Sequence, residues 1–133
     1  MGMSIVKYSE KNSPVECWGV LREGSIHQLK SDYPTHREVM ARYFLERDVF
    51  ESDIDSQAVD AKDVLFNSPV ATDVQLFCQG LNYAGHRAES GAADAKEENL
   101  IFMKAASSIC GPNDTIVRPA GCQLLDYEIE LAL

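Results

Sequence analysis

Residues 124–133, LLDYEIELAL, are the stretch of this sequence that decides its fold, because apolar and acidic side chains alternate along it. From Leu125 onward every second side chain is apolar, and those between them are acidic as far as Glu130. Neighbouring side chains of a β-strand point to opposite faces, so the pattern predicts a half-buried strand. Glu128 and Glu130 would share one face, with their Cα atoms about 6.5 Å apart.

Two carboxylates on one face of a strand repel each other unless water or a cation screens them. Hard divalent cations such as Mg²⁺, Mn²⁺ and Ca²⁺ prefer oxygen ligands, so Glu128 and Glu130 are candidate metal ligands. The alternative is an ordinary amphipathic strand with a wet acidic face. The alternation by itself is compatible with both.

A second polar cluster lies upstream, in residues 80–89, GLNYAGHRAE. His86 and Glu89 are three residues apart, so on a helix they would share a face and could form a hydrogen bond. A carboxylate on one imidazole nitrogen fixes the tautomer and leaves the other nitrogen to take a proton from water. The pair is a candidate catalytic base, and the alternative is a surface histidine beside a helix carboxylate.

Lys104 follows an apolar run at residues 100–103. A lysine at the end of a strand could hold a substrate carboxylate or stabilise a developing enolate. An exposed lysine without such a role is the alternative. His27 and His36 have no neighbours in sequence that would make a site.

The first part of the chain predicts a small antiparallel meander and one helix. Turn formers separate short segments rich in β-branched or aromatic residues, at residues 4–8, 15–21 and 26–29. Thr35 and Glu38 form a capping-box pattern. Apolar residues then recur at helical spacing and predict packing on the meander: Val39, Met40, Tyr43, Phe44 and Val49.

The remaining segments alternate between extended stretches and loops. Residues 51–63 are polar and acidic without an apolar period, which predicts a linker or loose loop, and residues 90–99 have the composition of a mobile loop. Extended segments are predicted at 64–70, 74–79, 100–103 and 115–118, and turns at 111–114 and 119–121.

The bulk composition describes an ordinary soluble globular protein. Of its residues, 45% are hydrophobic and 25% are charged, and the formal net charge is −9. A negative field argues against a nucleic-acid partner. The chain has neither an apolar run of about 20 residues, as a membrane span needs, nor a secretory signal. Its four cysteines form no CxxC pair, and together these features predict a reducing cytoplasm.

Four motifs occur in an order that resembles one enzyme family. Residues 80–89 resemble the G-x-N-Y-x-x-H-x-x-E signature of the fumarylacetoacetate hydrolase family. Residues 102–104, FMK, resemble its F-x-K strand, and the glycine, isoleucine and proline within 111–119 resemble its G…I…P segment. Residues 125–131, LDYEIEL, resemble its L-D-x-E-x-E-L metal strand. The resemblance is strong over residues 64–133 and much less specific before them.

The resemblance implies an α+β, mostly β fold in two parts. Residues 1–63 would be a small N-terminal domain of meander plus helix, similar to that of bacterial members. Residues 64–133 would begin a mixed β-roll, incomplete here, that carries the active site. Homodimers are usual in the family.

The resemblance also implies the chemistry. Glu128 and Glu130 would be two of three carboxylate ligands to a divalent ion, Mg²⁺ above all, with Mn²⁺ or Ca²⁺ as alternatives. The ion would chelate a small anionic 2-oxo acid. His86, oriented by Glu89 on a lid, would activate water or shuttle a proton, and Lys104 would help to hold the substrate. Members hydrolyse C–C bonds in acylpyruvates, decarboxylate oxaloacetate, or hydrate and isomerise dienoic acids of aromatic catabolism.

The family takes its third metal carboxylate from a strand beyond the Glu-x-Glu segment, and this sequence ends at Leu133. We therefore expect the 133-residue chain alone to be inactive. The alternative is a non-catalytic binding or regulatory fragment that pairs through its last strand with another chain by β-augmentation.

Overall fold

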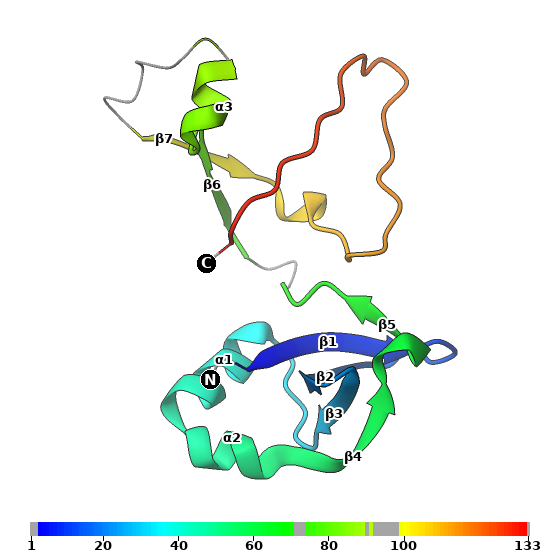
Figure 1. The fold of residues 1–133 in the computed structure, drawn as a ribbon. Coiled ribbons are helices and arrows are strands. Elements are labelled where there is room, and N and C mark those ends of the chain that lie inside the picture. Colours follow the sequence, from blue (N-terminus) through cyan, green and yellow to red (C-terminus); the bar gives the residue numbers. More distant parts are fainter. Residues whose placement is uncertain (1–2, 71–73, 90, 92–98, 133) are drawn as a thin grey trace.

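The structure is a computed structural model that describes residues 3–70, 74–89, 91 and 99–132. Its strands form two antiparallel sheets (Figure 1), one of five strands in the order β4-β3-β2-β1-β5 and one of two strands, β6 and β7. The five strands are β1 (Ser4–Glu10), β2 (Glu16–Arg22), β3 (Ser25–Leu29), β4 (Ile54–Asp60) and β5 (Val64–Asn67).

The predicted meander is confirmed as the centre of the larger sheet. β1 pairs with β2 from Ser4–Leu21 to Ser9–Glu16, and β2 pairs with β3 up to Arg22–Ser25. A two-residue turn closes the second hairpin, and both of its residues have positive φ, 49° at Glu23 and 81° at Gly24. Such turns match the right-handed twist of the flanking strands.

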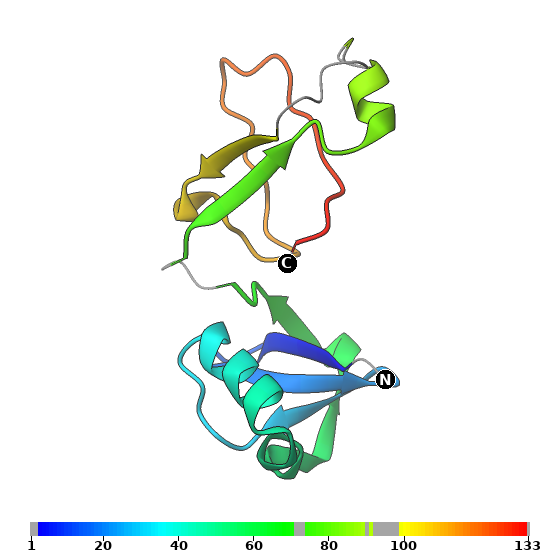
Figure 2. The same cartoon turned by 90° about the vertical axis from the view of Figure 1, so that its left-hand side faces the viewer.

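Two helices cover one face of this sheet (Figure 2): α1 (His36–Leu45) and α2 (Arg47–Asp53). The capping box predicted at the start of α1 is present, with Glu38 N–H donating to Thr35 Oγ1 at 3.4 Å and Thr35 N–H donating to Glu38 Oε2 at 3.2 Å. The buried side chains between helices and sheet form the main core: Trp18, Val20, Leu29, Tyr33, Val39 and Phe50.

The predicted apolar face of the first helix is correct only in part. Val39 is buried and Tyr43 packs against the core, whereas Phe44 is 73% exposed and Val49 is 49% exposed. Val49 departs from the prediction because α1 ends at Leu45 and α2 starts at Arg47, so Val49 does not continue the helical register of α1. Phe50, fully buried in α2, fills the core instead.

The prediction of a linker over residues 51–63 is wrong. This stretch contains the end of α2, strand β4 and a short 3₁₀ turn at Ala61–Asp63. β4 pairs with β3 and forms an edge of the sheet. An edge strand presents polar side chains to water, so its sequence lacks the apolar period by which strands are recognised.

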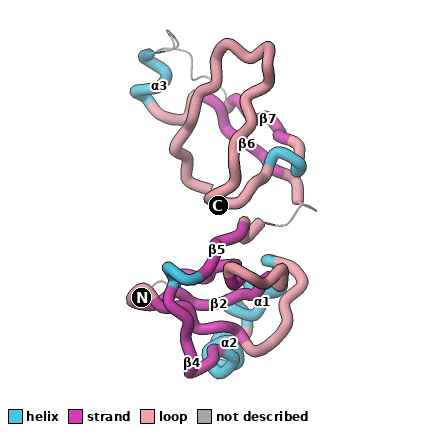
Figure 3. Tube along the Cα trace, turned by 90° about the vertical axis from the view of Figure 1, so that its right-hand side faces the viewer, coloured by secondary structure: helices cyan, strands magenta, loops and turns pink. Residues whose placement is uncertain are grey.

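The second sheet is a hairpin of β6 (Leu76–Gly80) and β7 (Leu100–Lys104), and helix α3 (Ala84–Glu89) follows β6. The extended segments predicted at 74–79 and 100–103 are therefore largely confirmed. The mobile loop predicted at 90–99 falls mostly outside the described residues. Figure 3 shows that this part of the chain consists largely of loops, in contrast to the five-stranded part.

The strands predicted at 115–118 and 124–133 are not formed in the described residues, which end at Ala132. The two predicted turns are present, since Asp114 N–H donates to Gly111 O and Cys122 N–H to Pro119 O. A turn is stabilised within its own residues, whereas a strand requires hydrogen bonds to a neighbouring strand. Alternation predicts the faces of a strand but not its partner.

The strand-rich mixture of helices and strands agrees with the predicted α+β class. A β-roll over the second half stays a prediction, as does the domain boundary between residues 63 and 64. β5, directly after that boundary, is hydrogen-bonded to β1 in the first sheet. Within the described ranges, no helix is long and apolar enough to cross a bilayer.

Candidate functional site

The first candidate region is the turn and short helix that follow β6. β6 ends at Gly80, Leu81 takes a left-handed conformation with φ 53°, and α3 starts at Ala84. A Cβ added to Gly80 would lie 2.8 Å from Leu100 Cδ2, so a glycine lets β7 approach closely at the end of the hairpin. Residues 80–83, GLNY, thus form the turn that connects β6 to α3.

The helix that the His86–Glu89 spacing requires is present. Both residues belong to α3, three positions apart, and both are exposed. A separation of three places two side chains on neighbouring positions of a helix surface. Their roles as a base and its orienting carboxylate stay predictions.

Arg87 is a residue of this region that the sequence interpretation did not select. Its Nη1 donates to two backbone carbonyls of the preceding turn, Leu81 O and Asn82 O, each at 3.2 Å. The side chain is partly buried, unlike those of its neighbours His86 and Ala88. No spacing rule points to an arginine that binds carbonyls five and six residues earlier, because the contact depends on the turn.

Lys104 is the last residue of β7, and its side chain is exposed. In the hairpin Leu76 pairs with Lys104 and Gly80 pairs with Leu100. Lys104 and the start of the α3 turn therefore lie at opposite ends of the hairpin, about 14 Å apart along the strands. The hairpin alone does not bring Lys104 to His86, and its substrate-binding role stays a prediction.

Glu128 and Glu130 are exposed and lie in the segment after residue 122, which forms no strand. Their carboxylate oxygens suit a hard divalent cation. Across the described parts of the chain, however, no group of three or more His, Cys, Asp or Glu side chains could hold a metal ion. These two residues therefore offer two oxygen donors rather than a complete metal site.

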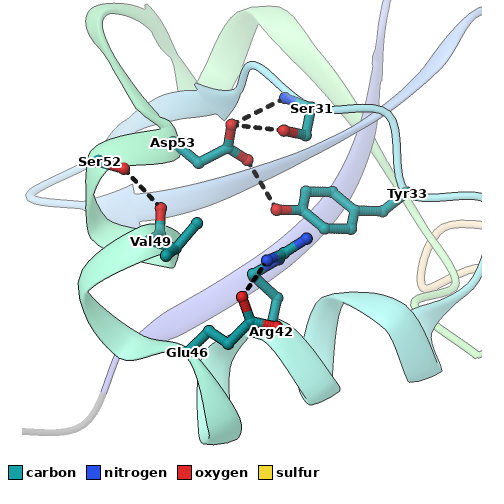
Figure 4. A network of polar contacts seen from close by, with 7 residues as sticks. All are labelled: Ser31, Tyr33, Arg42, Glu46, Val49, Ser52 and Asp53. Carbon is teal, nitrogen blue, oxygen red and sulfur yellow. Dashed lines mark hydrogen bonds and ion pairs between the residues drawn. The ribbon is translucent and has the colours of Figure 1, made fainter.

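The five-stranded part of the structure contains a polar network that no sequence pattern indicated (Figure 4). The Asp53 carboxylate accepts hydrogen bonds from Ser31 N–H at 3.0 Å, Ser31 Oγ at 2.7 Å and Tyr33 OH at 2.8 Å. Burial, followed by the hydrogen bond to Asp53, raises the pKa of Tyr33. The network ties the loop after β3 to the junction of α2 and β4, which is a structural role.

Two hollows in the described surface lie beside α1. One of about 410 Å³ is bordered by Tyr33, Arg42 and Glu46, and the other, of about 880 Å³, by His36, Met40 and Gln75. All five predicted site residues lie outside the linings of both hollows: His86, Glu89, Lys104, Glu128 and Glu130.

The second half of the chain matches a known protein family. Residues 75–133 match the family described as fumarylacetoacetate (FAA) hydrolase C-terminal. The human mitochondrial oxaloacetate tautomerase FAHD2A is 34% identical over 117 residues, which cover 83% of this chain and 37% of the relative. A bovine mitochondrial relative, also named FAHD2A, is 42% identical over 71 residues, 53% of this chain and 22% of its own length.

A putative hydrolase from Burkholderia cenocepacia is 52% identical over 54 residues, which cover 41% of this chain and 19% of the relative. The chain therefore spans little more than a third of the length of these curated relatives at most. No solved structure matches it significantly. Two of these relatives are named as mitochondrial, so a cytoplasmic location stays a prediction for this chain.

Proposed function

The chain belongs to the fumarylacetoacetate hydrolase family through residues 75–133, and from this we propose that it forms part of an enzyme for 2-oxo or β-diketo acids that depends on a divalent metal ion. The observation that carries the proposal is the ordered set of motifs within the matched residues. All five candidate site residues fall inside that match.

His86 is the proposed proton-transfer group. Its imidazole is exposed on α3 and can take a proton from water or from a substrate carbon, as histidine does in general base catalysis. Glu89, one turn further along the helix, would orient the ring. Lys104 would pair with a substrate carboxylate from the far end of the β6–β7 hairpin.

Glu128 and Glu130 would supply two carboxylate ligands of the ion, Mg²⁺ above all. When bound, such an ion acts as a Lewis acid that polarises the 2-oxo group. The described residues hold no complete set of ligands, so we assign no further ligands to the ion.

Among the reactions open to the family, keto–enol tautomerisation of oxaloacetate is the first to test, because the human and bovine relatives are named for it. In that reaction a proton leaves the carbon next to the keto group and another proton is added to the keto oxygen, with no net change in atoms or charge. A group such as His86 can serve both transfers in turn. The alternatives are acylpyruvate hydrolysis, oxaloacetate decarboxylation, and the hydration or isomerisation of dienoic acids.

Because we expect the 133-residue chain alone to be inactive, the activity is tested in the enzyme of which this chain is proposed to form part. The test follows the ultraviolet absorbance of enol-oxaloacetate with and without Mg²⁺. His86→Gln should lower the rate by about 10²- to 10⁴-fold, the usual contribution of general acid–base catalysis. His27→Gln is the matched control, since His27 lies in β3 and its Nδ1 contacts Asp55 O. An unchanged rate in His86→Gln would contradict the assignment.

The metal ligands are tested separately in the same enzyme by titration with Mn²⁺, detected by electron paramagnetic resonance. Glu128→Ala should weaken binding at least about tenfold, since even indirect partners of a metal contribute that much. Glu10→Ala, which removes an exposed carboxylate at the end of β1, should leave the affinity unchanged. Equal Mn²⁺ affinity in wild type and Glu128→Ala would sink the ligand assignment.

A non-catalytic fragment that pairs with another chain is the second candidate function. It is favoured by the segment 123–132, which has no strand partner among the described residues and exposes large apolar side chains: Leu124, Tyr127, Ile129 and Leu131. Such a segment can add to the edge of another sheet. In a homodimer, the form usual in the family, the partner would be a second copy of this chain. Sedimentation of the purified chain would distinguish monomer from dimer.

A further inference from the structure

The helix that carries His86 is too short to be stable by itself. α3 has six residues, whereas isolated helices shorter than about 12–15 residues are marginal in water. Its side chains are exposed except for that of Arg87, which is partly buried. The position of His86 therefore depends on contacts that hold α3 against the rest of the chain.

The turn before α3 is strained and needs support as well. Leu81 has φ 53°, a conformation that residues other than glycine rarely adopt and that persists only where the surroundings impose it. Leu81 follows directly on β6, which ends at Gly80, so its conformation sets the direction in which the chain leaves the hairpin.

One side chain joins the turn to the helix. Arg87 Nη1 donates to Leu81 O and to Asn82 O, both at 3.2 Å, and Arg87 N–H donates to Tyr83 O at 3.1 Å. The guanidinium thereby connects Leu81, the strained residue, to α3, the helix that carries Arg87. A hydrogen bond from a charged donor is stronger than one between neutral groups, and the planar guanidinium is rigid.

We propose that Arg87 is a positioning residue, which locks the Leu81–Asn82 turn against α3 and thereby fixes the place and orientation of His86. The role of His86 in proton transfer rests on the proposed function, whereas the bracing of the turn does not. Arg87 precedes Ala88 and follows His86 directly, so a shift of the arginine backbone moves the imidazole with it.

The bracing is tested by nuclear magnetic resonance on the 133-residue chain, without metal or substrate. The ¹³C shifts of Leu81 report its positive φ, and the ¹⁵N shifts of the His86 ring report its tautomer and surroundings. Arg87→Met keeps most of the stem and removes the donors, and should shift both sets of signals. Arg87→Lys restores a charged donor and should return the signals part of the way to wild type.

Arg118→Met is the matched control, because it removes the same charge and a guanidinium that donates to another backbone carbonyl, Cys122 O at 2.7 Å. It should leave the Leu81 and His86 signals unchanged. The indole signal of Trp18, a core residue of the five-stranded part, verifies that each variant keeps its fold. Wild-type Leu81 signals in Arg87→Met would overturn the proposal, and so would a change at Leu81 without one at His86.

The link to catalysis is tested in the enol-oxaloacetate assay, on the enzyme of which this chain is proposed to form part. Arg87→Met should lower kcat about tenfold to a hundredfold, the effect of a misplaced reacting group, with little change in KM, and Arg87→Lys should recover part of the loss. Absence of activity in the wild-type enzyme, together with the expected resonance shifts in the 133-residue chain, would reject the proposed function but keep the bracing of the turn by Arg87. Full kcat in Arg87→Met would reject the positioning role.

Discussion

Phe50 is the residue on which the N-terminal core depends most clearly. It is fully buried, packs with Val39, and meets the Tyr43 ring edge-on at a centroid distance of 5.4 Å. Phe50→Ala should lower the free energy of unfolding by about 3–5 kcal/mol, because it removes buried apolar area and leaves a cavity. Urea unfolding followed by Trp18 fluorescence measures this loss.

Phe44→Ala is the matched control for that experiment, since Phe44 is a phenylalanine of the neighbouring helix whose side chain is largely exposed. It should change the free energy of unfolding by less than about 0.5 kcal/mol. A similar loss in both variants would mean that Phe44 is covered in solution and that the packing face of α1 is wider than described.

Tyr8 makes the stability of the fold depend on pH in the alkaline range. Burial, with smaller contributions from Cys17 and Glu10, raises the pKa of Tyr8 from 10.0 to about 12. The folded state thus holds the phenolic proton more tightly than the unfolded state. This contribution is fully present below about pH 10 and is lost as the pH rises through about 12, and two pKa units correspond to about 3 kcal/mol.

The measurement compares wild type with Tyr8→Phe, which cannot ionise at this position. The free energy of unfolding should fall more steeply in wild type between about pH 9 and about pH 12, and the difference isolates Tyr8 from the other groups that titrate there. Parallel curves for the two proteins would show that the folded and unfolded states share one Tyr8 pKa.

Among the elements, α1 has the clearest start signal. Thr35 and Glu38 satisfy each other's backbone amides in a complete capping box. Thr35→Ala should cost about 1 kcal/mol, because it leaves the Glu38 amide without its acceptor. Thr35→Ser keeps a hydroxyl in place and should retain most of the stability. Urea midpoints of the three proteins measure the effect, and equal midpoints for Ala and Ser would contradict it.

The elements that the sequence pattern failed to predict share a physical cause. β4 lies at a sheet edge, where β3 provides its hydrogen bonds on one side, and its polar residues have no period. The strand predicted at the end of the chain has the period but no partner in the described residues. Local alternation records how side chains divide between two faces, whereas strand formation is a contact between distant segments.

At the scale of the molecule, we expect the protection of backbone amides against hydrogen exchange to differ between parts of the chain. The amides of β1, β2 and β3 lie in a continuous hydrogen-bonded ladder, whereas residues 115–118 and 123–132 have no strand pairing in the structure. Hydrogen exchange with mass spectrometry should therefore show slow exchange in the first group and fast exchange in the second.

Protection of residues 123–132 equal to that of β2 would contradict the described backbone and indicate pairing with another chain. A dilution series separates the two explanations, because pairing between copies weakens as the protein concentration falls. The exposed apolar side chains of β7, such as Ile101 and Met103, would be the next place to look for such contact.

The sequence by itself determined the family, the meander, the capped helix and the candidate set of His86, Glu89, Lys104, Glu128 and Glu130. These depend on residue type at short spacing, which local chemistry sets. Only the tertiary structure placed β4 at the sheet edge, Phe50 in the core and Arg87 on the carbonyls before α3. Each of these depends on where the chain turns, because a contact between separated residues exists only once the backbone has brought them together.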